Sequence, residues 1–221
     1  ELAPTDFKEL RESRHELFLV KQVWDLVHHV TISFEDWMRS AFMEVDVEGF
    51  LDEIRRMAKQ LKGQPMQTRD WSVYRGLEEE VGNMNKSLPL CAELRTPAMR
   101  PRHWGDLLAL SGGHTQIDPA SASFTLAKLV ALGVHQLSEE ISNIVEKAQK
   151  ELNIERVLNK IVDAWSRIVF DYEFHKEYDV HVLCPVEAII EQLEADTNAL
   201  QSMLSDRFVD FFLEKVQLWQ R

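Results

Sequence analysis

The stretch from Asp46 to Gly63 reads DVEGFLDEIRRMAKQLKG, and its periodicity decides the fold class. Asp46 stands where a side chain can cap the first helical turn, and Gly63 stands where a helix ends. Between them, apolar residues recur every three to four positions and so share one face of an α-helix: Val47, Phe50, Leu51, Ile54, Met57, Ala58 and Leu61. Each such face must be buried against another helix, which predicts a helical bundle.

The same helical pattern appears on both sides of this stretch. Before it, Ser33 is placed to cap a helix with the apolar face Phe34, Trp37, Met38, Ala41 and Phe42. After it, a third stripe comprises Trp71, Tyr74, Leu77, Val81, Met84 and Leu88. Pro89 is expected to interrupt or bend this third helix. Short helices are predicted after Thr96-Pro97 and after Arg100-Pro101, because proline suits the first helical turn.

The stretch from Ser111 to Ser123 reads SGGHTQIDPASAS, a composition that favours turns over core. We interpret this loop, residues 111–123, as the joint between two possible helical subdomains, 1–112 and 122–221. Beyond the loop, two separate helices are predicted. The first carries Ile141, Ile144, Val145 and Ala148, and the second carries Val157, Leu158, Ile161, Val162, Trp165, Ile168 and Val169.

One segment departs from the helical pattern. Phe170, Tyr172 and Phe174 alternate with charged residues, and Val180 and Val182 flank His181. This period of two predicts a small β-hairpin near residues 169–183 that turns at 176–178. Helical spacing then resumes in Val186, Ile189, Ile190, Leu193, Leu200 and Leu204, and again in Phe211, Phe212, Val216 and Trp219. The predicted fold class is therefore mainly α, an elongated multi-helix bundle with one small β-hairpin.

The net charge and the lengths of the apolar runs limit the kinds of partner expected for the chain. The formal charge of −12 repels polyanions, so a nucleic-acid partner is not expected. No apolar run approaches the roughly 20 residues of a membrane span, so no membrane partner is expected. The two cysteines, Cys91 and Cys184, are expected to be free thiols in a reducing compartment. Because the chain starts at Glu1 and closes on a helical pattern at Arg221, we expect it to be a piece of a longer polypeptide.

No sequence motif for catalysis stands out. No pair of glycines has the spacing and the following lysine of a phosphate-binding loop, and Gly112-Gly113 is interpreted as a flexible turn. The adjacent pair His28-His29 points to different faces of a helix, and His175 and His181 would need to meet across the hairpin and gain a third ligand to bind metal. The runs Glu78 to Glu80 and Glu139-Glu140 are interpreted as solvated helix faces. The tryptophans are expected mostly in the core.

A resemblance to a known family rests on several segments in order. The central one reads LPLCAELRTPAMRPRHW from Leu88 to Trp104, preceded by LFLVKQVWDLV from Leu17. The later ones are Phe124 to Leu126, Leu129 to His135, Glu139 to Ile141, AQKELNIE from Ala148 and FLEKVQLWQ from Phe212. Together they resemble the N-terminal part of the linker region of dynein heavy chains, of the axonemal or flagellar type and outer-arm-like.

The resemblance implies a non-catalytic mechanical lever that swings over the ring of six AAA+ ATPase modules and converts ATP hydrolysis into movement along microtubules. No cofactor is expected in this chain, because ATP and magnesium would bind downstream in the parent motor. The implied partners are the AAA+ ring of the same heavy chain, intermediate and light chains, and microtubules, in the axoneme of a cilium or flagellum. Contact with the ring or another partner is predicted for Arg95, Arg100, Arg102 and His103, since arginine forks suit carboxylate-bearing surfaces.

Two other functions fit the helical pattern. A spectrin-like protein-binding scaffold or tethering module without a motor role is the first, although no helical repeat of constant length appears and the hairpin interrupts the helices. An all-helical hydrolase is the second, and it would need one of the histidine sites discussed above.

Overall fold

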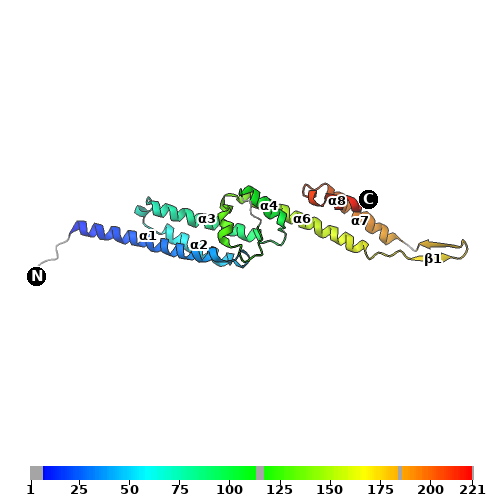
Figure 1. Ribbon diagram of the computed structural model, residues 1–221, viewed down its shortest axis with the longest axis horizontal. Coiled ribbons are helices and arrows are strands. Elements are labelled where there is room, and N and C mark those ends of the chain that lie inside the picture. The colour runs from blue at the N-terminus through cyan, green and yellow to red at the C-terminus, as the bar shows by residue number, and fades with distance from the viewer. Residues whose placement is uncertain (1–6, 113–116, 184–185, 221) are drawn as a thin grey trace. The chain divides into compact units, whose positions relative to one another are not determined.

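The computed structural model describes residues 7–112, 117–183 and 186–220, and it confirms a mainly α fold with one antiparallel hairpin (Figure 1). The chain divides into two compact units, Glu1–Val145 and Glu146–Arg221. The helices of four residues or more are α1 Lys8–Arg39, α2 Val47–Lys62, α3 Ser72–Leu94, α4 Pro101–Leu110, α5 Leu126–Ala131, α6 Ser138–Trp165, α7 Glu187–Leu204 and α8 Leu213–Gln220. The strands are β1 Tyr172–His175 and β2 Val180–Leu183.

Helix α2 forms as its sequence predicts. The Asp46 side chain accepts a hydrogen bond from the Gly49 amide at 3.1 Å, and Gly63 follows the last turn. A Cβ atom on Gly49 would lie 2.3 Å from Asp46 Oδ2, so a larger residue there would require the Asp46 carboxylate to shift. Helix α3 packs against α2 with the predicted stripe, which buries Tyr74, Leu77, Val81, Met84 and Leu88.

Three predicted helix boundaries differ from the structure. Ser33 does not cap a helix, because α1 is continuous from Lys8 to Arg39. Pro89 does not interrupt α3, which runs on to Leu94; the core contacts of Leu88, Leu90 and Cys91 offset the roughly 3 kcal/mol that an internal proline costs. The segment after Pro97 forms a turn and not a helix.

The two helices predicted after residue 140 are one helix, α6. Its buried stripe does not stop at Ala148, because Glu151 and Ile154 are also buried and carry the same period to Leu158. A stripe that continues at three- and four-residue steps gives the chain no reason to leave the helix.

The first unit has one core that includes residues from both sides of the loop 111–123. The Phe42 amide donates to the Phe124 carbonyl at 2.9 Å, and the Leu126 amide donates to the Ser40 carbonyl at 3.0 Å. Ala41 and Thr125 form an isolated antiparallel bridge. These bonds join the two sides of the loop within the first unit, and the division between the units falls at Val145, further along the chain than the predicted joint.

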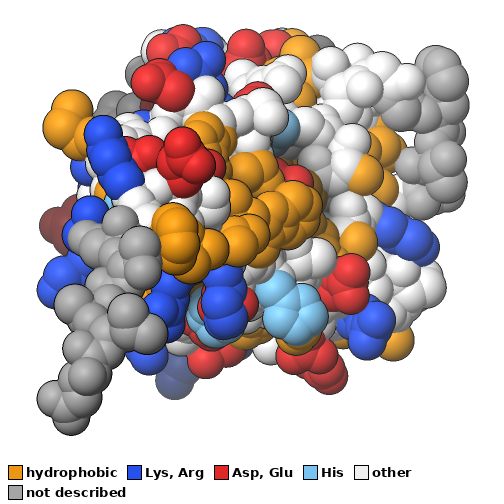
Figure 2. Space-filling model, turned by 90° about the vertical axis from the view of Figure 1, so that its left-hand side faces the viewer, with side chains coloured by type: hydrophobic (Ala, Val, Ile, Leu, Met, Phe, Trp, Pro, Cys, Tyr) orange, Lys and Arg blue, Asp and Glu red, His pale blue; other side chains and the backbone are white. Residues whose placement is uncertain are grey.

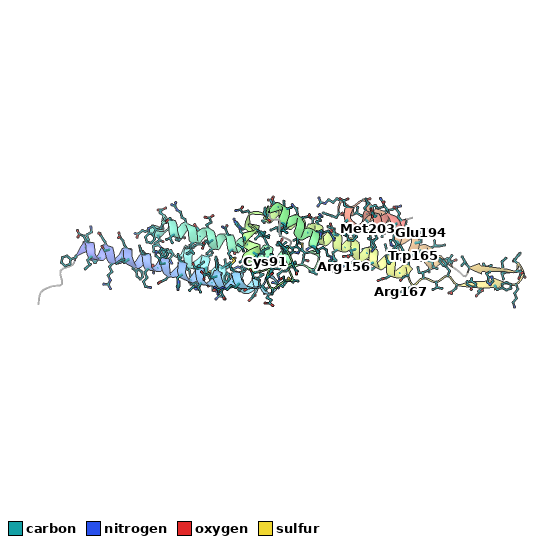
Figure 3. All side chains as sticks on the ribbon, in the orientation of Figure 1. Cys91, Arg156, Trp165, Arg167, Glu194 and Met203 are labelled. Carbon is teal, nitrogen blue, oxygen red and sulfur yellow. The ribbon has the colours of Figure 1, made fainter. Side chains whose placement is uncertain are left out.

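The second unit has its own core, built from the C-terminal part of α6 with α7 and α8: Ile154, Leu158, Ile161, Leu200, Met203, Val209, Phe212 and Val216. At its edge, Trp165 Nε1 donates to Asp196 Oδ2 at 2.9 Å, which ties α6 to α7 (Figure 3). Strands β1 and β2 pair in the predicted region, with Tyr172 opposite Leu183 and Phe174 opposite His181.

Candidate interaction surfaces

The four residues predicted to contact a partner lie in one segment of the first unit, between the end of α3 and the first turn of α4. Arg95 is half-buried, and its guanidinium donates to the Val45 carbonyl at 2.7 Å and to the Met43 carbonyl at 2.6 Å. These carbonyls belong to the connection between α1 and α2. Arg95 therefore joins two parts of the same unit, a role that the sequence did not reveal.

His103 is completely buried at the start of α4. Its Nδ1 accepts a hydrogen bond from the Arg100 amide at 3.0 Å, so the ring closes the first turn of the helix. Pro101 occupies the first helical position, as predicted. Arg100 and Arg102 are partly exposed, as Arg95 is, so three of the four predicted residues reach the surface.

Trp104 anchors α4 in a cluster of three aromatic rings. Its ring centroid lies 5.5 Å from that of Phe42 and 5.9 Å from that of Phe124, with edge-to-face geometry in both pairs. Trp104 also lines a surface pocket of about 470 Å³ together with Met99, Pro101 and Ile117. Arg100 and Arg102 therefore lie next to a well-packed aromatic cluster.

Cys91 is fully buried on α3. Burial raises the pKa of its thiol to about 11, and the positive charge of Arg95 opposes that shift only in part. A thiol with such a high pKa is a poor nucleophile at neutral pH. The second cysteine, Cys184, lies outside the described residues, as does Gly113 of the predicted turn.

The hairpin of the second unit is exposed on both faces. Tyr172, Phe174 and Leu183 share one face and are 66%, 49% and 57% exposed. His181 lies between the two aromatic rings, with centroids 5.2 Å from each. His175 pairs with Val180 and so points to the opposite face, which means that His175 and His181 do not meet.

Among the described residues, no group of three or more His, Cys, Asp and Glu side chains is placed to hold a metal ion. His28 and His29 are exposed on α1, and the runs Glu78 to Glu80 and Glu139-Glu140 are exposed as predicted. In the same ranges, no helix combines the length and the apolar character needed to cross a membrane.

Helix α1 carries an exposed apolar surface that sequence reasoning missed. Trp24 was expected in a core with most other tryptophans, and Trp37 and Trp104 are indeed buried, but Trp24 is 56% exposed. Beside the C-terminal half of α1 lies a groove of about 510 Å³ whose apolar lining is Phe34, Met38, Met84 and Val130. The available signal was a second set of apolar residues, spaced seven apart, on a helix that already had one buried stripe.

Comparison with known proteins identifies the family. Residues 10–221 match the model of the family described as "Dynein heavy chain, N-terminal region 2". The chain is 37% identical over 220 residues to dynein axonemal heavy chain 11 of Sus scrofa, 37% over 216 residues to the ciliary dynein beta chain of Heliocidaris crassispina, and 36% over 223 residues to the flagellar outer arm dynein beta chain of Chlamydomonas reinhardtii. These alignments cover 98–100% of the chain but 5% of each relative. The chain belongs to the dynein heavy chain family and corresponds to part of its N-terminal region.

Proposed function

We propose that this chain is a non-catalytic mechanical lever, the N-terminal part of the linker that swings over the ATPase ring of a dynein motor. The observation that carries the proposal is the extent of the family match, which runs over residues 10–221 and so includes both compact units. The chain spans about 5% of the relatives that it matches. ATP hydrolysis and the binding of ATP and magnesium are therefore assigned to other parts of the parent heavy chain.

The packing of the first unit suits a part that transmits force. Its core is continuous from α1 to the start of α6 and includes the interlocked rings of Phe42, Trp104 and Phe124. Close-packed protein interiors have low compressibility, so such a body moves as a whole under load. Arg95 adds two charge-assisted hydrogen bonds between distant parts of the chain.

The proposed setting is the axoneme of a cilium or flagellum, supported by relatives whose names are axonemal, ciliary and flagellar. The proposed partners are the AAA+ ring of the same heavy chain, the intermediate and light chains of the complex, and microtubules. The acidic charge of −12 is consistent with the absence of a nucleic-acid partner from this set.

Within this function, Arg100 and Arg102 are the residues we assign to contact with the ring. Both are partly exposed beside the packed aromatic cluster, and a guanidinium suits a carboxylate on an opposing surface. Arg95 and His103 belong to the same segment, but they support it from within: Arg95 binds main-chain carbonyls, and His103 is buried.

The test replaces Arg100 and Arg102 with Ala in the full-length motor. We expect slower microtubule gliding with the ATPase activity retained. A lever that loses a ring contact transmits less of the movement produced in each ATPase cycle. Arg55→Ala is the matched control, since Arg55 is an exposed arginine of the same unit that pairs with Asp52 one turn away. Gliding equal to that of the control in a folded double mutant would refute the ring contact, and gliding by a motor that lacks residues 1–221 would refute the lever.

A further inference from the structure

Helix α1 has two apolar stripes, and only one of them faces the core. Leu19, Val23, Leu26 and Val30 are buried. Leu10, Leu17 and Trp24 form the second stripe and are 67%, 69% and 56% exposed. Their spacing of seven residues is close to two helical turns, so they form a line along the helix. We call this line the α1 seam.

The seam leads directly into the groove beside α1. Two further steps of seven residues reach Thr31 and Met38, and both line that groove. Across from them lie Met84 of α3 and Val130 of α5. Figure 2 shows that exposed hydrophobic side chains occur among charged ones on the face turned to the viewer. A line of exposed apolar residues that ends in an apolar groove has the length and shape of a site for one helix.

Charged residues of opposite sign lie on the two sides of the α1 seam. From the helical period, Arg14 and Lys21 lie along one side of it and Glu9 and Glu16 along the other. All four are exposed. Lys21 also pairs with Asp25 on the same helix, but both side chains are more than 60% exposed, and such pairs are weak enough to exchange. In paired helices, charges in these flanking positions select the partner and its orientation.

We propose that the α1 seam and its groove bind one amphipathic α-helix of the parent heavy chain, from outside these 221 residues. Its apolar face covers Leu10, Leu17 and Trp24, its acidic side faces Arg14 and Lys21, and its basic side faces Glu9 and Glu16. Heavy chains of this family carry abundant further polypeptide, because the chain spans about 5% of its relatives. The proposal rests on family membership and not on the lever function.

A second copy of the chain fits the seam less well. Self-pairing in register would place Trp24 against Trp24 and the polar Thr31 against Thr31. The groove beside Met38 is walled by α3 and by the segment from Val130 to His135. A second copy paired in register would bring the bundle attached to its own α1 to the same place.

Photo-crosslinking in the full-length heavy chain tests the proposal. Leu17 is replaced by the photo-reactive residue benzoylphenylalanine, and Phe18 is the matched control, since it is 56% exposed but turned about 100° away from Leu17 on the helix. We expect position 17, and not position 18, to crosslink to one heavy-chain peptide outside these residues, with apolar residues at helical spacing between an acidic and a basic side. A mixture of isotopically light and heavy chains shows whether the link lies within one chain.

Three results would overturn the proposal: links from position 17 to residues 8–38 of a second copy, links to a different subunit, or a yield no higher than that at position 18. The charge pattern has its own test. Lys21→Glu should lower the crosslink yield at position 17 by roughly two- to fivefold, the effect of one exposed ion pair. Lys86→Glu, an exposed site on α3, should leave the yield unchanged. An equal yield in both variants would contradict the pairing of charges. Microtubule gliding enters none of these readouts, so this proposal and the lever can fail separately.

Discussion

Helices α2 and α3 and the hairpin β1–β2 are held in place by different means. The helix pair buries its apolar side chains within the first unit, and Leu88 is completely buried. The hairpin leaves Tyr172, Phe174 and Leu183 about half exposed or more. A two-stranded hairpin is marginally stable by itself in water. The helix pair is therefore stabilised by its place in the core of the first unit, whereas the hairpin contributes surface.

The largest expected difference comes from truncating one apolar residue in each region. Leu88→Ala should lower the free energy of unfolding by about 2–5 kcal/mol, because it leaves a cavity in a close-packed core. Phe174→Ala should change it by less than about 0.5 kcal/mol, since the ring is 49% exposed. Urea denaturation followed by circular dichroism measures both variants. Equal losses would show that the hairpin is as much a part of the core as α3.

Arg95 tests whether the first unit also depends on polar contacts within it. Arg95→Ala removes the donors to the Val45 and Met43 carbonyls and should cost about 1–3 kcal/mol in the free energy of unfolding. Arg95→Lys keeps the charge but loses the planar fork, so it should recover only part of the loss. Thermal unfolding measures the stability of both variants against that of the unmodified chain. If Arg95→Ala is as stable as the unmodified chain, the contacts of Arg95 do not stabilise the first unit.

The smallest effect concerns ionisation of Cys91. Its pKa rises from 9.0 to about 11 on burial, so the folded chain keeps this proton in a pH range where the unfolded chain loses it. The stability that the neutral thiol contributes is fully present below pH 9 and is lost as the pH rises toward 11. Relative to Cys91→Ala, the unmodified chain should lose on the order of 1–2 kcal/mol over this range. If the free energy of unfolding changes equally with pH in the two chains, Cys91 lies in a solvated site.

Local patterns predicted some elements well. Helix α2 was predictable because its cap, its stripe and its terminal glycine all lie within one short stretch. The hairpin was predictable for the same reason, since alternation and turn are local. The continuity of α1 and α6 was not, because a capping residue such as Ser33 is only an option that the rest of the chain can override. Pro89 shows the same limit, as its cost is offset by burial that depends on distant residues.

The candidate interaction site was predictable as a segment but not as a set of roles. The carbonyls that Arg95 binds lie 50 and 52 positions earlier in the chain, a distance that no local pattern encodes. The unit boundary at Val145 also follows from long-range contacts, since Phe124 and Leu126 return to the end of α1. Predicting that Trp24 is exposed would have required knowing which of the two stripes on α1 the bundle covers.

Because of the cap of α2, the effect of a substitution at position 49 depends on the residue at position 46. Alanine at position 49 would normally favour a helix by about 1 kcal/mol over glycine, but here its Cβ would require the Asp46 carboxylate to shift relative to the Gly49 amide. The cost of that shift subtracts from the gain while Asp46 is present. Once Asp46 is replaced by a residue that cannot cap, the same alanine becomes purely favourable. Substitutions at these two sites are therefore epistatic, and in related sequences a non-glycine residue at position 49 should accompany the loss of the capping side chain.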